Sequence, residues 1–238
     1  AVVTPNNDYG DRVRKYIENF SSINNQLKAK FKFIVYDEKN PDFYKVSKLI
    51  SDYENRKIKL ENEIEILKKL NTIDSLKKLE ELEKLDTYGE LDFEAIILMT
   101  QNFNELSNLS SILPYYDVDP KKIQYIGNSL WSKDQALKEP GLENGYFTSR
   151  NIESRKKFEI MYAQIFRDKP HSLATYTYDL IGLIGKIHSL NNNFEIQMLY
   201  SDKGFIGTDG WFKIHKSGKV TRKPNVYKIK NQEFKIIK

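Results

Sequence analysis

Two short apolar runs that flank a helical segment constrain this chain most, and both lie within residues 93–149. The first run, residues 95–99, stops at Thr100-Gln101-Asn102, and the second, residues 123–126, stops at residues 127–131. Between the runs, apolar residues recur at helical spacing: Phe103, Leu106, Leu109 and Leu113. Strand, helix and strand in this order are typical of a parallel sheet, in which ligands bind beyond the carboxyl ends of the strands. The segment therefore predicts where a site should lie.

Residues 1–36 show the same alternation. Val2-Val3 predicts a strand, residues 5–10 form a polar loop, and residues 31–36 predict a second strand. The helix between them is marked by apolar residues at helical spacing, namely Val13, Tyr16, Ile17 and Phe20. Two such units predict an α/β fold with a parallel sheet flanked by helices.

Residues 43–86 interrupt the alternation with two charged amphipathic segments. One apolar stripe runs from Phe43 to Leu70 and another from Leu76 to Leu85, with a break at residues 71–74. The pattern predicts a helical hairpin inserted at about residues 51–86. Two interpretations stay open: an insertion with a solvated outer face, or an arm that docks a partner.

The last third of the chain changes character. Residues 141–149 predict a short strand that leaves the sheet, and two helices follow, one around residues 158–166 and one over residues 172–190. Residues 204–214, a turn at residues 216–219 and residues 225–229 predict a β-hairpin. The glycines at 204, 207 and 210 read as turn glycines. We therefore expect one domain over 1–149 and a second segment over 150–238.

Composition excludes several classes of protein. No apolar run approaches the roughly 18 residues of a membrane helix, so no membrane-spanning segment is expected. The chain has 238 residues and no cysteine, which removes disulfides and thiolate metal sites. The net charge of +5 comes from lysines interleaved with acidic residues, without a basic cluster among aromatic residues, so no nucleic-acid partner is expected.

No recognisable catalytic or cofactor motif is present. His171, His188 and His215 have no neighbours at metal-ligand spacing, and no phosphate-binding or dinucleotide-binding loop occurs. Asp202 and Asp209 suggest a calcium loop only loosely, because the EF-hand pattern is not met. We expect no enzyme activity, no metal and no cofactor.

Neutral polar and aromatic side chains follow the predicted strands. Such groups suit a neutral ligand or a protein surface, and the alternative is ordinary capping of loops. The candidate ligand-binding or partner-binding residues are Tyr9, Thr100, Gln101, Asn128, Ser129 and Trp131.

The order of these segments resembles the type I periplasmic binding proteins, the leucine-binding-protein-like fold. The resemblance rests on Val2 to Gly10, Ala95 to Met99, Ile123 to Trp131, Gly145 to Phe147, Tyr176 to Asp179 and Gly204 to Phe212. A narrower resemblance, to the penicillin-binding protein activators of alphaproteobacteria, rests on Leu85 to Thr87, Leu113 to Pro120 and Gly127 to Trp131. That branch is similar to the C-terminal domain of the lipoprotein activator of peptidoglycan synthases.

The resemblance implies that residues 1–149 form a second lobe with the helical insertion. Residues 150–238 would then be a return segment that adds helices and a β-hairpin to an incomplete first lobe. Ser129 falls where transport members use a carboxylate to bind an ammonium group, and a serine is neutral.

The resemblance therefore favours a non-catalytic envelope protein that regulates peptidoglycan synthesis by contact with a penicillin-binding protein. The alternative is a solute-binding protein that delivers an amino acid or another small polar ligand to an ABC permease. The implied location is the periplasm, with lipoprotein anchoring through a missing N-terminus. The chain begins in an apolar strand, which suggests a fragment or a processed protein.

Overall fold

The computed structural model describes residues 1–23, 30–191 and 194–237. The chain divides into two compact units. The first unit comprises residues 1–146 and 229–233, and the second comprises residues 147–228 and 234–238. The α-helices are α1 (Asp8–Ile23), α2 (Phe43–Ile50), α3 (Tyr53–Leu70), α4 (Ile73–Leu82), α5 (Phe103–Ile112), α6 (Ile152–Phe166) and α7 (Ala174–Asn191).

The strands form one seven-stranded and one three-stranded sheet among the described residues. The larger sheet has the order β10-β9-β5-β4-β3-β1-β2. The smaller sheet has the order β6-β7-β8. The strands are β1 (Val2–Pro5), β2 (Phe33–Tyr36), β3 (Ala95–Leu98), β4 (Gln124–Gly127), β5 (Tyr146–Ser149), β6 (Phe205–Gly207), β7 (Gly210–Ile214), β8 (Val220–Arg222), β9 (Asn225–Lys230) and β10 (Glu233–Ile236).

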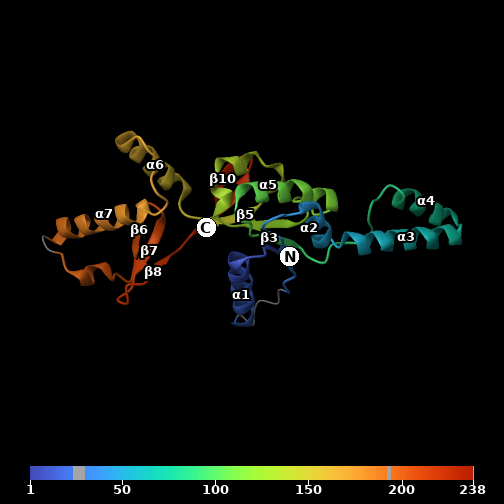
Figure 1. The fold of residues 1–238 in the computed structure, drawn as a ribbon, viewed down its shortest axis with the longest axis horizontal. Coiled ribbons are helices and arrows are strands. Elements are labelled where there is room, and N and C mark those ends of the chain that lie inside the picture. The colour runs from blue at the N-terminus through green and yellow to red at the C-terminus, as the bar shows by residue number, and fades with distance from the viewer. Residues whose placement is uncertain (24–29, 192–193, 238) are drawn as a thin grey trace. The chain divides into compact units, whose positions relative to one another are not determined.

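The core of the first unit is the parallel sequence β4-β3-β1-β2. Its strands are apolar on both faces and largely buried, as expected for a parallel sheet that helices cover. Helices α2 and α5 lie on one side of these strands and α1 on the other (Figure 1). The predicted α/β fold with a mostly parallel sheet is therefore confirmed.

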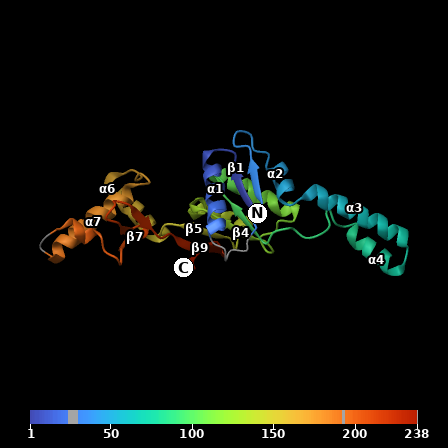
Figure 2. The ribbon, with the colours of Figure 1, turned by 90° about the horizontal axis from the view of Figure 1, so that it is seen from below.

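The predicted helical hairpin is present as α3 and α4, which we call the arm. The two helices share a small core of their own, made by Leu60, Leu67 and Leu82. Asn71 ends α3 in the left-handed conformation, and Thr72 caps α4 with a reciprocal hydrogen-bond pair to Ser75. The arm extends away from the strands of the first unit in both views (Figures 1 and 2).

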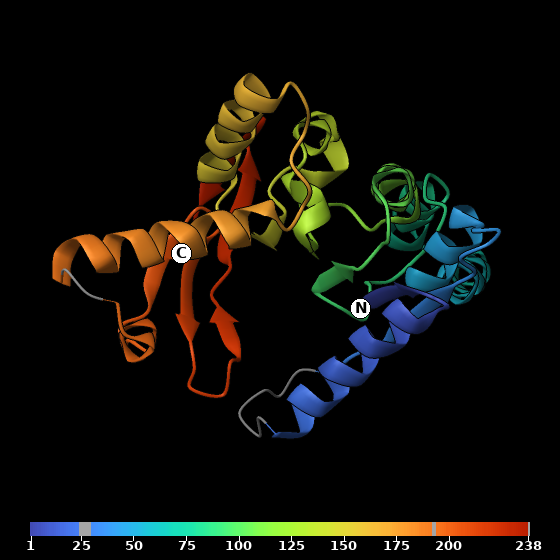
Figure 3. The same cartoon turned by 60° about the vertical axis from the view of Figure 1, so that its left-hand side comes forward.

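In the second unit, α7 crosses the strands of the three-stranded sheet (orange helix in Figure 3). The turn between β6 and β7 is held by two side chains one turn apart on α7. The hydroxyl of Thr175 donates to Asp209 over 2.8 Å, and Asp179 accepts the backbone N–H of Thr208 over 2.8 Å. This attachment fixes the turn on the helix.

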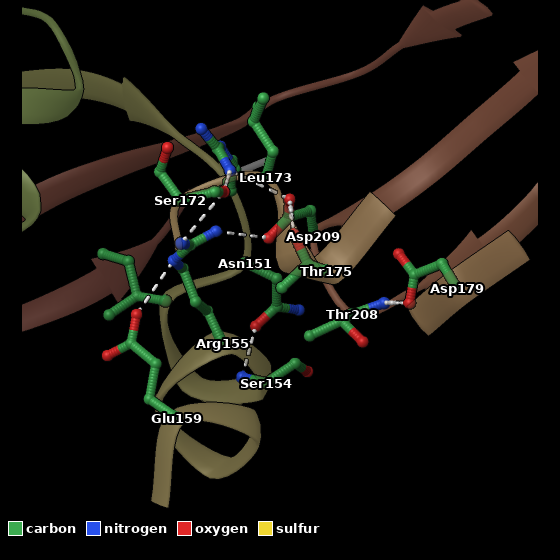
Figure 4. A network of polar contacts seen from close by, with 12 residues as sticks. Asn151, Ser154, Arg155, Glu159, Ser172, Leu173, Thr175, Asp179, Thr208 and Asp209 are labelled. Atoms are coloured by element: carbon green, nitrogen blue, oxygen red, sulfur yellow. Dashed lines mark hydrogen bonds and ion pairs between the residues drawn. The ribbon is translucent and has the colours of Figure 1, made fainter. Parts of the chain in front are cut away.

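The buried carboxylate of Asp209 also accepts hydrogen bonds from two guanidinium groups. Arg150 and Arg155 approach its two oxygens to 3.1 and 3.2 Å, and Arg155 pairs in addition with Glu159 (Figure 4). Because two guanidinium groups offset its charge and a hydroxyl donates to it, Asp209 is a structural residue of the second unit. The loose suggestion of a calcium loop is therefore not supported by its surroundings.

The predicted C-terminal hairpin is wrong in its pairing. Residues 204–214 form two strands instead of one, because Gly210 adopts a positive φ of 104° and the chain turns at Thr208-Asp209. The turn near Gly218 joins β7 to β8, and β8 ends before Pro224. Residues 225–230 leave this sheet and enter the larger one as β9.

Candidate functional site

The carboxyl ends of β1, β3 and β4 meet at one edge of the first unit's sheet. Leu98 aligns with Val3 on one side and with Gly127 on the other, and all three strands run parallel. The residues that follow these strands therefore share an edge, which we call the rim. The rim contains Tyr9, Thr100, Gln101, Asn128 and Ser129.

Asn128 connects the three strand ends. Its Nδ2 donates to the hydroxyl of Tyr9 over 2.9 Å and lies 3.5 Å from the carbonyl oxygen of Thr100. Its Oδ1 accepts the backbone N–H of Leu130 over 2.9 Å. The structure thus brings three of the predicted site residues into direct contact. Some of their hydrogen-bonding groups are therefore paired with one another and are not available to a ligand.

Gln101 and Ser129 are the exposed members of the rim. The backbone N–H of Gln101 donates to Glu105, and the carbonyl oxygen of Ser129 accepts the hydroxyl of Ser132. Their side chains present a neutral amide and a neutral hydroxyl to the solvent. Neither can balance an ammonium charge.

Trp131 does not offer the exposed flat surface that the sequence suggested. Its ring is fully buried, and it packs against two glycines of the first unit. A Cβ at Gly127 would lie 2.1 Å from the ring, and one at Gly145 would lie 2.4 Å from it. Trp131 therefore supports the rim from within the core and has no surface for a ligand.

Glu105 is a further residue of this edge that was not among the predicted site residues, and it lies at 8% exposure in the first turn of α5. Its carboxylate accepts from Asn102 Nδ2 over 2.8 Å, from the N–H of Gln101 over 3.1 Å and from the hydroxyl of Tyr36 over 2.6 Å. Burial and the hydrogen bond to this carboxylate raise the pKa of Tyr36. The spacing Asn102-x-x-Glu105 is a capping signature and could have identified this residue.

Two buried polar atoms near the rim have no partner among the described residues. They are the hydroxyl of Thr100 and the Nδ2 of Asn7. The Oδ1 of Asn7 is occupied, because it accepts the N–H groups of Tyr9 and Gly10 at the start of α1. Together with the exposed side chains of Gln101 and Ser129, these two groups are hydrogen-bonding capacity that is left at the rim.

No histidine lies in the first unit, and the carboxylate beside the rim, Glu105, accepts hydrogen bonds from Tyr36, Gln101 and Asn102. His171, His188 and His215 all belong to the second unit. Within residues 1–23, 30–191 and 194–237, no group of three or more His, Asp or Glu side chains could hold a metal ion. None of the described helices is long and apolar enough to cross a membrane.

The base of the arm is the other feature that could serve recognition. The guanidinium of Arg56, in α3, donates from Nε and Nη2 to the carbonyl oxygen of Gly89 over 3.1 and 2.9 Å. The same Nη2 lies 3.0 Å from the carboxylate of Asp117, which also accepts the hydroxyl of Thr87. These contacts hold the arm to the segments on both sides of β3.

Comparison with protein-family models and with curated protein sequences found no match. Solved structures do match over 99% of the chain. A protein from Rhodospirillum rubrum assigned to branched-chain amino acid ABC transport has a TM-score of 0.60 at 12% identity, and 59% of its length is covered. The leucine-binding protein LivK of Thermotoga maritima has a TM-score of 0.52 at 13% identity, with 59% of its length covered.

A third match is the C-domain of LpoA from Haemophilus influenzae, a regulator of PBP1A. Its TM-score is 0.50 at 12% identity, and the chain covers 60% of it. The chain therefore has the fold of type I periplasmic binding proteins, with LpoA-like structures among those it resembles, and it spans about three fifths of their length. These matches are binding and regulatory proteins.

Proposed function

We propose, on the premise of a type I periplasmic-binding-protein fold, that this chain is a non-catalytic envelope protein that acts by contact with another protein. The partner we propose is a peptidoglycan synthase of the penicillin-binding protein class, as for the activators that the sequence resembles. The likeness to the LpoA C-domain supports this choice at the level of the fold. The periplasm, with a lipoprotein anchor, is the location that goes with it.

The observation that carries the proposal is the rigid base of the arm. Arg56 is buried, and its guanidinium fork reaches a backbone carbonyl and a carboxylate at once. Charge-assisted hydrogen bonds of this kind fix geometry as well as add stability. We therefore favour a partner-docking arm over the alternative, an insertion with a solvated outer face, because that alternative does not require a fixed attachment.

The outer end of the arm supplies an apolar surface on this support. Ile66, Leu70, Ile73 and Leu76 lie on both sides of the link at residues 71–72 and are each about half exposed or more. Lysine and glutamate side chains surround them on α3 and α4. An apolar centre with a charged surround is the usual composition of a protein interface.

The experiment is a binding measurement between the 238-residue chain and a purified bifunctional penicillin-binding protein. Serine at Ile66, Leu70 and Ile73 should weaken binding at least tenfold, about 1.4 kcal/mol. The matched control places serine at Tyr44, Leu49 and Tyr115, which are at least half exposed as well but lie outside the arm. Equal affinity of both triple variants, or no binding by the unmodified chain, would overturn the proposal.

A solute-binding role is the second candidate, and the unpartnered Thr100 hydroxyl and Asn7 amide favour it. These donors suit a small polar ligand, and an ABC permease would then be the partner. Thermal-shift measurements with free amino acids separate the two roles, because a ligand that binds the folded state raises the melting temperature. A clear shift that Thr100→Val removes would favour the solute-binding role.

We further propose that residues 150–238 form part of a first lobe, which additional polypeptide completes. The supporting observation is the apolar surface that the second unit leaves exposed on its two helices. It comprises Ile160, Met161, Ile165, Phe166 and Leu180. A longer chain that includes a first lobe should protect the α6 and α7 amides from hydrogen exchange more strongly than this chain does.

A further inference from the structure

Helix α7 contains two glycines in its interior, at positions 182 and 185. Glycine in the middle of a helix lowers stability, because it has more freedom to lose than alanine. A Cβ at either position would meet nothing within 4 Å. Close packing within the described chain therefore does not account for these glycines.

Asp179 lies on the same helix and is only 9% exposed. Its Oδ1 accepts the N–H of Thr208, but its Oδ2 is buried and has no partner among the described residues (Figure 4). A buried carboxylate oxygen without a hydrogen bond is costly unless a cation or donor reaches it. The side chain therefore lacks a partner that its burial calls for.

The carboxylate of Asp209, in the same unit, is also buried, but all of its charge is offset by groups of the chain. Asp209 receives two guanidinium groups and one hydroxyl, from Arg150, Arg155 and Thr175. No corresponding cation is bonded to Asp179 Oδ2 in the described part of the chain. Asp209 is thus paired within the unit, whereas the Oδ2 of Asp179 is left as an acceptor that a cationic ligand could bind.

A cavity of about 640 Å³ adjoins Asp179 and lies entirely within the second unit. Its volume is within the range of small-molecule sites. Apolar side chains form most of its wall, including Ile181, Leu183, Phe205 and Phe212, and Gly182 leaves its helical side open. One buried acceptor in an apolar wall is the arrangement that selects a ligand with a single charged end.

We propose that this cavity binds a primary ammonium group carried on a compact apolar body. The ammonium donates to Asp179 Oδ2, and the apolar body packs against Phe205 and Phe212. Lys186 lines the same cavity and repels a second positive charge, so the site prefers monoamines to diamines. The site lies in the second unit and does not depend on the function proposed for the arm and the rim.

Phenethylammonium and its uncharged counterpart 2-phenylethanol test the proposal on the 238-residue chain. We expect the amine to raise the melting temperature with increasing concentration and to bind in calorimetry, and the alcohol to do neither. Asp179→Asn should weaken amine binding at least tenfold, because its amide still accepts from Thr208 but carries no charge. The matched control is Asp202→Asn, an exposed carboxylate of the same unit that pairs with Lys213; it should bind the amine as the unmodified chain does.

Gly182→Leu separates binding from folding. Leucine favours the helix and occupies the cavity, so this variant should keep its circular dichroism spectrum and lose amine binding. The proposal is overturned if the amine and the alcohol stabilise the chain equally, or if Asp179→Asn and the unmodified chain bind the amine equally. It is also overturned if the amine produces no shift at millimolar concentration.

Discussion

The side-chain amide of Asn128 donates to the hydroxyl of Tyr9 over 2.9 Å, although the two residues are 119 positions apart. This bond links the end of β4 to the first turn of α1 across the intervening strand β3. It is therefore the contact that makes the rim one structure instead of three separate loops.

Removing this bond should lower stability modestly. We expect Tyr9→Phe to reduce the free energy of unfolding of the first unit by about 1 kcal/mol, the usual net value of one hydrogen bond. A double-mutant cycle combines this variant with Asn128→Ala. The losses of unfolding free energy in the two single variants should not add in the double variant, because both remove the same bond. Urea unfolding measures both quantities. Tyr16→Phe is the control, since Tyr16 is 72% exposed on the same helix; additive losses would contradict the assignment.

The arm should become more mobile when the contacts of Arg56 at its base are removed. Arg56→Met removes the donor of the Gly89 carbonyl and leaves the Asp117 carboxylate with the Thr87 hydroxyl alone, and we expect a loss of about 2 kcal/mol. Arg56→Lys should recover only part of it, because an ammonium cannot form the fork. Hydrogen exchange should become faster in α3 and α4 and stay unchanged in α5. Arg12→Met, at an exposed position of α1, serves as the control; unchanged exchange in the arm would show that Arg56 does not hold it.

Much of the first unit could be predicted from the sequence, because its strands are short apolar runs that end at polar residues. Residues 95–99 and 123–126 became β3 and β4, and their parallel pairing placed Thr100 and Asn128 at one edge. That placement follows from local periodicity and from the geometry of parallel sheets alone.

The parts that the sequence did not predict depend on distant contacts. Trp131 is buried because Gly127 and Gly145 leave room for its ring, and no local pattern reports that packing. Similarly, residues 225–230 looked like the partner of residues 210–214, but they pair in the larger sheet. A strand's partner is chosen by tertiary burial, which periodicity does not encode.

Two buried phenols should make the fold sensitive to alkaline pH. Burial raises the pKa of Tyr36 and of Tyr125, whose hydroxyl donates to the carbonyl of Val118 over 2.6 Å. Because the folded pKa lies above the unfolded pKa of about 10, their contribution is complete below pH 10 and is lost as the pH rises further.

Titration followed by phenolate absorbance checks this expectation. Tyr36→Phe and Tyr125→Phe should each remove one late-titrating phenol and reduce the loss of stability above pH 10. Tyr115→Phe, at an 82% exposed position, is the control and should leave the loss of stability above pH 10 unchanged. If Tyr36 and Tyr125 ionise near pH 10 while the chain is folded, the assignment is wrong.

Gly127 is a position at which a single added methyl group should disturb the rim. The methyl group of Gly127→Ala would lie 2.1 Å from the fully buried ring of Trp131, so the ring or the strand must move. Forcing a methyl group into such a packed site costs about 1–3 kcal/mol. Since Asn128 follows directly, the same movement should weaken its bond to Tyr9.

Tryptophan fluorescence excited at its red edge reports the displacement, provided that Trp211 is first replaced by phenylalanine so that Trp131 is the single tryptophan. In that background, Gly127→Ala should shift the emission of Trp131 to the red and lower the urea midpoint. Gly185→Ala is the matched control, because a Cβ at this position meets nothing within 4 Å. Alanine favours the helix more than glycine does, so the stability of this variant should rise by up to about 1 kcal/mol. Unchanged emission and midpoint in Gly127→Ala would mean that Trp131 does not hold the rim in place.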